Sequence, residues 1–345
     1  MSTSKILSFG ELLLRLSPSS NGGWIRDQSI ATYVGGSELN VAAALASWGL
    51  SARYFTALPD HVLSRDLLGF LAEKGVDSSA VQFSGSRIGL YYLPSGADLK
   101  SAEVIYDRSN SSFSELRPGT VDWNGLLRDV SWLHLSAITP ALGKQLANVC
   151  IELVQAAAAR NITISLDLNF RGKLWKYGES PLEVMPEIAR HCDLIMGNIW
   201  AANKLLGTPL KIEGDVVLDK AGFVDQALST SKAIIERFAK VKHVANTFRF
   251  DTAEDAVQYY ATLYSDQHLY LSEEILADGV VNRIGSGDCF MAGLIYGQHQ
   301  QWEPSAIVNF SAAAAVSKMR EIGDMTSSSS KAILADMDKH RAARD

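Results

Sequence analysis

Short runs of apolar residues alternate with longer segments whose apolar residues recur at helical spacing through most of the chain. The first pair is a strand over residues 5–9 and an alanine-rich helix over residues 37–48, with Gly49 where a helix end favours glycine. The same pattern predicts further strands at 53–57, 132–136, 163–168, 194–196 and 243–246, and further helices at 65–74, 142–159, 200–206, 223–239, 289–296 and 331–340. Strands that alternate with helices indicate an α/β fold with a mostly parallel sheet and helices on both faces.

Two segments interrupt this alternation. Residues 89–94 and 102–107 are rich in strand-forming residues and flank a turn-like stretch at 95–98, which predicts an inserted antiparallel hairpin. Residues 12–16 and 30–34 could pair with that hairpin. We therefore expect an α/β core at 1–11, 35–86 and 110–345, and a β-sheet lid at 12–34 and 87–109. Its free edges and partly apolar face would also allow a homodimer through the lid.

Composition and charge narrow the class of protein. The 345 residues are 47% hydrophobic and 20% charged, as is ordinary for a globular enzyme. The net charge of −6 and the lack of a basic stripe disfavour a nucleic-acid partner. No apolar run approaches the ~20 residues that span a bilayer, and the N-terminus lacks a signal-peptide core, so we expect a cytoplasmic protein without a membrane partner. The three cysteines are widely spaced, which disfavours a disulfide framework or a zinc site.

The sequence Gly285-Ser286-Gly287-Asp288 is the most informative candidate for chemistry. Its small residues leave bare backbone N–H groups at a helix start, where unsatisfied donors and the helix dipole favour an anion. A carboxylate there suits a general base beside a phosphate, with Asp288 taking a hydroxyl proton and the amides stabilising the transferred group. Taken alone, the motif fits an ordinary turn with a capping aspartate better.

A glycine pair near the N-terminus favours the phosphate-binding interpretation over an ordinary turn. Gly35 and Gly36 precede the first helix, where they would let a ligand approach the backbone, and Asn40 could bond a hydroxyl. Together the two motifs resemble the ribokinase or PfkB family of carbohydrate kinases, from about residue 6 to residue 325. The resemblance implies a Rossmann-like, ribokinase-like core with a β-sheet lid, ATP and Mg²⁺ as cofactors, and catalysis by Asp288 with residues 285–287.

Within that family the chain is most similar to 2-keto-3-deoxygluconate kinases. The similarity lies in residues 9–11, 14–18, 87–91, 104–108, 167–171, 246–249 and 281–284. A sugar acid needs a cation, and the planar fork of Arg108 could bind its carboxylate. Tyr106 and Arg108 would face the same side of one strand. The resemblance adds Tyr91 to this substrate site, with Gly35, Gly36, Asn40 and Asp288.

The resemblance also implies contacts with the nucleotide and the transferred phosphate. Arg171 follows a buried strand that carries Asp167 and Asn169 at its end, and the family pattern puts it near the phosphate. A salt bridge between Arg171 and Asp167 is the alternative. Nucleotide contacts are implied for the C-terminal half of the chain, at Asn198, Asn246, Arg249, Gly285 and Gly287.

Two departures from the family pattern leave the metal ligands unassigned. The chain has Asn282 where the family usually has an aspartate, and Ala201 where a glutamate usually follows Asn198 by three residues. Three hypotheses follow: a 2-keto-3-deoxygluconate kinase, a kinase of fructose or another neutral sugar, and a sugar-acid sensor with weak catalysis. A dehydrogenase is disfavoured because residues 9–11 lack the three-glycine turn of a dinucleotide site.

Overall fold

A computed structural model describes residues 4–18, 24–25, 29–94, 104–211, 218–252 and 256–342. Among these residues, nine strands form the main sheet, in the order β14-β13-β12-β11-β10-β9-β1-β4, with β15 paired to β13. The strands are β1 (Lys5–Phe9), β4 (Ala52–Phe55), β9 (Val130–Ser136), β10 (Thr163–Asp167), β11 (Leu194–Gly197), β12 (His243–Asp251), β13 (Val257–Ser265), β14 (His268–Leu271) and β15 (Ile275–Ala277). All pairings from β4 to β12 are parallel, which confirms the predicted fold class.

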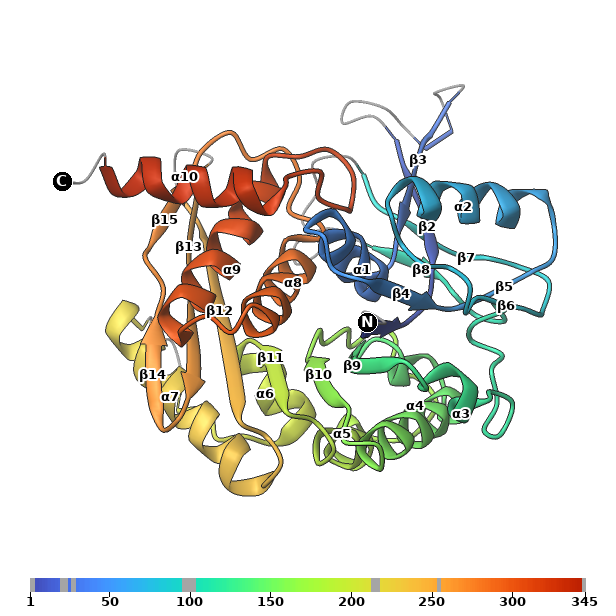
Figure 1. Cartoon of the computed structure of the whole chain (residues 1–345), viewed down its shortest axis with the longest axis horizontal. Coiled ribbons are helices and arrows are strands. Elements are labelled where there is room, and N and C mark those ends of the chain that lie inside the picture. Colours follow the sequence, from blue (N-terminus) through green and yellow to red (C-terminus); the bar gives the residue numbers. More distant parts are fainter. Residues whose placement is uncertain are drawn as a thin grey trace.

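Helices cover both faces of this sheet (Figure 1). They are α1 (Ser37–Ser47), α2 (Val62–Glu73), α3 (Trp123–Leu126), α4 (Lys144–Ala158), α5 (Pro181–Ala189), α6 (Ile199–Leu206), α7 (Lys220–Arg237), α8 (Ser286–His299), α9 (Pro304–Met319) and α10 (Ser330–Ala342). Successive strand residues point to opposite faces, so Ile6 packs in one core cluster with α1 and α8, and Leu7 in the other with α4. Among the helices of the described residues, none has enough apolar length to span a bilayer.

The sequence pattern missed several elements in the C-terminal half. Helix α9 lies against α8, α10 and β13, so most of its residues are buried and it shows no polar face to mark a helix. Helix α5 carries Pro186 in its interior, which obscures a helical pattern, although a capping box of Ser180 and Glu183 starts it. The antiparallel strands β13 to β15 were also not predicted. These segments do not follow the alternation of strand and helix from which the other elements were predicted.

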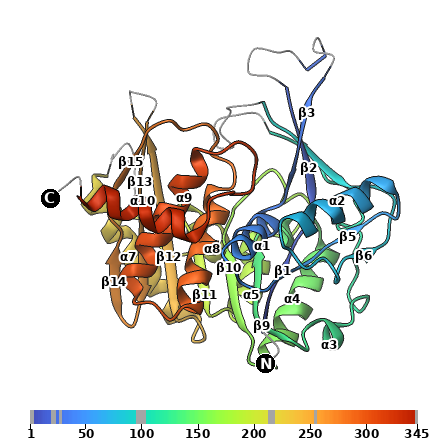
Figure 2. The same cartoon turned by 45° about the horizontal axis from the view of Figure 1, so that its top comes forward.

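A second, four-stranded sheet stands off the main sheet (Figures 1 and 2). Its order is β3-β2-β7-β8, with β2 (Leu13–Ser17), β3 (Ala31–Gly35), β7 (Gly89–Tyr92) and β8 (Ile105–Asp107). Strands β7 and β8 are antiparallel, as expected for the inserted hairpin, and Tyr91 lies opposite Tyr106. The predicted turn at 95–98 lies outside the described residues. Arg108 follows the last residue of β8, so strand alternation does not set its direction.

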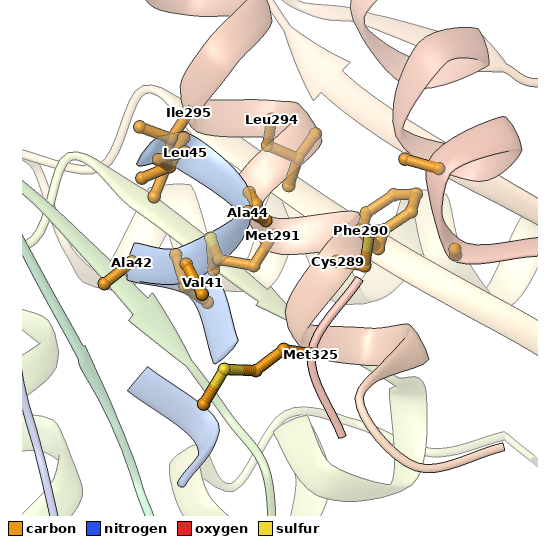
Figure 3. Packing of buried hydrophobic residues seen from close by; sticks show 14 of the residues in the cluster. Val41, Ala42, Ala44, Leu45, Cys289, Phe290, Met291, Leu294, Ile295 and Met325 are labelled. Atoms are coloured by element: carbon orange, nitrogen blue, oxygen red, sulfur yellow. The ribbon is translucent and has the colours of Figure 1, made fainter. Parts of the chain in front are cut away.

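Close packing of α1, α8 and α9 fixes the start of α8. Small residues of α1, including Ala42 and Ala44, share one core cluster with Met291 and Leu294 of α8 (Figure 3). On the other side of α8, Gly293 faces α9 so closely that an added Cβ would lie 2.7 Å from the Cα of Ser311. Gly293 weakens the helix intrinsically, but it permits the contact that holds α8 in place.

Substitution of two helical glycines tests this packing. We expect Gly293→Ala to lower the free energy of unfolding by about 1–3 kcal/mol, because the methyl group overpacks the contact with α9. The matched control is Gly69→Ala in α2, where an added Cβ meets nothing within 4 Å, so higher helix propensity should stabilise the fold by up to about 1 kcal/mol. Urea denaturation of both variants measures the difference. Equal stabilisation by the two substitutions would contradict the packing argument.

Candidate active site

A cleft of about 610 Å³ opens where the carboxyl ends of β10 and β11, the first turns of α1 and α8 and the second sheet meet. Clefts of this size and place hold small ligands in α/β proteins. Most residues that the sequence predicted for the site line it. They are Gly36, Asn40, Tyr91, Tyr106, Arg108, Arg171, Asn198, Arg249, Gly285, Ser286, Gly287 and Asp288.

The Asp288 carboxylate lies where the first turns of α1 and α8 converge. Its side chain is buried, at 7% exposure, yet it lines the cleft. The hydroxyl of Ser37 donates to Oδ1 of Asp288 at 2.7 Å, and Nδ2 of Asn40 donates to Oδ2 at 2.7 Å. Both carboxylate oxygens are thus held by donors from the start of α1. The sequence did not single out Ser37, and its position directly after Gly36 at a helix start was the only signal.

Burial raises the pKa of Asp288 above its usual value because a desolvated carboxylate is costly. The hydrogen bonds from Asn40 and Ser37 and the charge of Arg171 oppose this rise, whereas the nearby Asp324 adds to it. The net effect is a raised pKa. A carboxylate whose pKa moves toward neutrality is a better proton acceptor, because a general base works best near the operating pH.

Asn40 also presents an unused acceptor. Its side chain is 5% exposed and lines the cleft, and its Oδ1 has no hydrogen-bond partner among the described residues. A buried acceptor without a donor is unfavourable, so this atom favours a ligand that carries a hydroxyl or amine donor.

The loop before α8 exposes backbone N–H groups. Gly285 has φ of 78°, and an added Cβ would lie 1.9 Å from the carbonyl oxygen of Asp324, so only glycine fits. The hydroxyl of Ser286 donates to the Arg283 carbonyl at 2.8 Å. For the N–H groups of Gly287 and Asp288 we find no acceptor in the part of the chain that the structure describes. Two free amides at a helix N-terminus can bind an anion.

Arg108, predicted to hold a ligand carboxylate, is already in a buried ion pair. Its Nε donates to Oε2 of Glu11 at 2.6 Å, with side-chain exposures of 7% and 1%. Ser111 donates to the other oxygen of Glu11. The two terminal nitrogens of Arg108 have no partner among the described residues, and Arg108 lines the cleft. That end of the guanidinium can still bind a carboxylate through two parallel hydrogen bonds.

Asp324 is a cleft residue that the sequence analysis missed. It lies in the loop after α9 and accepts hydrogen bonds from Arg15 at Oδ1 (2.9 Å from Nε) and from the Tyr91 hydroxyl at Oδ2 (2.7 Å). Arg15 also stacks over the ring of Tyr33, 4.0 Å from its centroid. No motif surrounds Asp324, and its importance arises only from the folding of residues far apart in the sequence.

Two predicted contacts do not line the cleft. Asn246 is 2% exposed and donates from Nδ2 to the hydroxyl of Ser231 at 3.3 Å, so it joins β12 to α7. An added Cβ at Gly35 would lie 2.4 Å from Oδ2 of Asp324, so Gly35 makes room for that carboxylate. Both residues thus have packing contacts in this structure, and their predicted contacts with a ligand stay predictions. Asn198 does line the cleft, where its Oδ1 caps α6 by accepting from the Ala201 amide at 2.8 Å.

Arg171 also lines the cleft, and among the described residues it forms no salt bridge with Asp167. Its charge nevertheless counters the rise in the pKa of Asp167, which burial and Asp288 push well above the usual value. The cleft lining contains five cationic side chains (Arg108, Arg171, Lys204, Arg249 and Arg283) and three carboxyl groups (Asp167, Asp288 and Asp324). This excess of positive charge suits anionic ligands.

The described part of the chain has no group of three or more His, Cys, Asp or Glu side chains placed to hold a metal ion. Asn282, which stands where the family usually has aspartate, has a structural role here. Its Nδ2 donates to the Gly323 carbonyl at 2.6 Å, and its Oδ1 accepts from the Ile284 amide at 3.0 Å.

Comparison with known proteins identifies relatives of most of the chain. The family model for pfkB family carbohydrate kinases matches residues 3–331. A 2-dehydro-3-deoxygalactonokinase of Haloferax volcanii is 30% identical over 213 residues. That alignment spans 62% of this chain and 65% of the relative, just under two thirds of its length.

Solved structures extend the similarity to the fold. The 2-dehydro-3-deoxygluconokinase of Thermotoga maritima is 30% identical and has a TM-score of 0.88, covering 97% of this chain and 99% of that one. A fructokinase of Xylella fastidiosa with bound ATP has a TM-score of 0.74, covering 98% and 99% of the two chains. At 19% identity, that second likeness concerns the fold alone.

Loss of one donor to Asp288 should change its proton affinity. In Ser37→Ala, Oδ1 of Asp288 loses its hydrogen bond, so the pKa of Asp288 should rise further above its usual value. Nuclear magnetic resonance of ¹³C-labelled aspartate carboxyl groups across pH measures this pKa. Ser47→Ala is the control, because among the described residues the Ser47 hydroxyl bonds only to the Ala44 carbonyl of the same helix. A lowered or unchanged pKa in Ser37→Ala would contradict the assigned geometry.

Proposed function

The chain belongs to the pfkB family of carbohydrate kinases, and from this premise we propose that it phosphorylates the primary hydroxyl of 2-keto-3-deoxygluconate with ATP. The observation that carries the proposal is the juxtaposition, in one cleft, of the Asp288 carboxylate, the free amides at the start of α8 and the open end of Arg108. The carboxylate and the amides can support phosphoryl transfer, and the open end of Arg108 can bind the carboxylate of an acidic acceptor.

In the proposed reaction, Asp288 accepts the proton of the sugar hydroxyl as its oxygen attacks the γ-phosphorus. The bond between the γ-phosphorus and the bridging oxygen breaks, and ADP leaves with the electron pair. The amides of Gly287 and Asp288 and the guanidinium of Arg171 stabilise the negative charge of the transferred group. The unpaired Oδ1 of Asn40 accepts a hydrogen bond from a second hydroxyl of the sugar.

ATP would occupy the half of the cleft beyond the α8 loop. Arg249, Lys204 and Arg283 supply positive charge there. Trp200, 40% exposed, and Phe250 also line this half, and their flat apolar faces suit a purine base. Because the described residues lack a carboxylate cluster for a metal, Mg²⁺ would be held mainly by the nucleotide phosphates, whose charge it neutralises.

The choice of 2-keto-3-deoxygluconate rests on the Thermotoga maritima kinase of that substrate, which aligns with nearly the whole chain at 30% identity. The Haloferax volcanii relative is named for the galactonate epimer of the same keto acid. A neutral hexose such as fructose is the second candidate, because Glu11 already neutralises Arg108. A sugar-acid sensor is less well supported, since Asn282 has its own structural partners and Asp288 keeps its donors.

The proposal includes a homodimer through the lid. Strands β3 and β8 are the two edges of the second sheet, and Ile105 on β8 is 51% exposed. Open strand edges with exposed apolar residues favour pairing with another chain.

The role of Asp288 is tested by Asp288→Asn. This variant keeps the shape of the side chain but removes the proton acceptor, so kcat should fall by about 10²–10⁴-fold while the affinity for a non-hydrolysable ATP analogue stays within about threefold of wild type. An ADP-release assay and calorimetry provide the two values. Turnover near the wild-type rate would defeat the mechanism. Wild-type protein that binds the sugar acid without releasing ADP would identify a sensor.

The role of Arg108 in substrate choice is tested by Arg108→Lys. Lysine keeps a positive charge beside the buried Glu11, which avoids an unpaired buried carboxylate, but it lacks the planar fork. For a keto sugar acid, kcat/KM should fall about 10–100-fold, and for fructose it should change less than about threefold. An assay of a panel of sugars and sugar acids measures both. Efficient wild-type turnover of fructose with none of the acid would reject the substrate assignment.

A further inference from the structure

Lys318, in the last turn of α9, is completely buried, at 0% exposure. A buried lysine is rare unless polar partners compensate for its desolvation. Its Nζ donates to the carbonyl oxygen of Gly323 at 2.8 Å and makes a longer contact with that of Glu321 at 3.4 Å. No carboxylate forms a salt bridge with it in the ranges that the structure describes. The ammonium group therefore sits among backbone carbonyls, as a small monovalent cation does when carbonyl oxygens replace its water.

The Lys318 side chain packs against the loop that precedes α8, next to Gly285. An added Cβ on Gly285 would lie 3.3 Å from Cε of Lys318 and 1.9 Å from the Asp324 carbonyl. The Gly323 carbonyl that accepts from Lys318 also accepts from Asn282, at 2.6 Å. Lys318 thus holds the segment 321–323, to which Asn282 also bonds and against which the left-handed turn at Gly285 packs.

Burial and the surrounding charges together hold the pKa of Lys318 below its usual value. Burial lowers the pKa of Lys318, while Glu321 and Asp324 oppose that shift and Arg15 reinforces it. The carboxylate of Glu321 stays available as a countercharge, since Ser327, Ser328 and Thr326 donate to it and help hold its own pKa below the usual value. The mechanism described above gives this buried group no task.

We propose that Lys318 is a positioning residue that serves as a built-in cation for the phosphate-binding loop. It holds the Gly323 and Glu321 carbonyls, keeps Gly285 in its left-handed turn and adds positive potential behind the amides of Gly287 and Asp288. The inference rests on the proposed anion-binding role of residues 285–288, and it does not depend on which sugar is the acceptor. A residue that only caps α9 would contribute to stability and leave anion affinity unchanged.

The test is the salt dependence of nucleotide binding by Lys318→Ala, which leaves space for a small cation. Calorimetry gives the Kd of a non-hydrolysable ATP analogue at constant ionic strength in choline, potassium or ammonium chloride. The wild-type Kd should be the same in all three salts. In choline, Lys318→Ala should bind the analogue about tenfold more weakly or worse, and potassium or ammonium should restore most of the loss. Lys331→Ala, at an exposed site on α10, is the matched control and should behave as wild type.

Folded Lys318→Ala that binds the analogue with wild-type affinity in choline would overturn the inference, as would a weakened affinity that neither cation restores. If Lys318→Ala does not fold, Lys318→Met fills the same volume without a charge, and it should bind weakly in every salt. Wild-type affinity in Lys318→Met would equally overturn the inference. The binding experiment contains no sugar. Failure of the wild type to turn over the keto acid would therefore reject only the substrate assignment. Failure of the wild type to bind the analogue rejects the proposed function and, with it, this role for Lys318.

Discussion

The Asp288 carboxylate, held between the first turns of α1 and α8, is the interaction on which the rest of the site depends. Its donors, Ser37 and Asn40, are 251 and 248 residues away in the sequence, so the hydrogen bonds form only when both helices are fixed in place. Small residues in α1 pack against α8 (Figure 3), and the close contact of Gly293 with α9 adds to that fixation. With both oxygens held, the carboxylate can be buried without losing its ability to accept a proton.

Buried ion pairs distribute charge around this carboxylate. Glu11 with Arg108, and Asp324 with Arg15, put two cations and two anions at the boundary between the second sheet and the core. Each pair is almost completely desolvated, so removal of one partner would leave an uncompensated charge. The two ion pairs therefore fix the positions of Arg108 and Asp324, the members of the pairs that line the cleft. Glu11 uses only Nε of Arg108, so the two terminal nitrogens of this cleft-lining residue have no partner among the described residues.

The sequence revealed the elements whose pattern is local. Alternating strands and helices predicted the parallel part of the sheet, and glycine with aspartate at a helix start predicted the loop at 285–288. It did not reveal α9, which is buried on most sides, or Asp324, which becomes a cleft residue only through its contacts with Arg15 and Tyr91. Two residues predicted to contact a ligand do not line the cleft. Gly35 and Asn246 resemble their cleft-lining neighbours in sequence, but they contact Asp324 and Ser231.

A crystal structure of the protein with ADP, aluminium fluoride and 2-keto-3-deoxygluconate would test the central claim most directly, since the fluoride complex mimics the transferred phosphoryl group. The account predicts fluoride within about 3 Å of the amide nitrogens of Gly287 and Asp288. It also predicts the primary hydroxyl of the sugar within about 3 Å of the Asp288 carboxylate. A complex in which another side chain faces that hydroxyl, or in which the fluoride lies away from the start of α8, would contradict it.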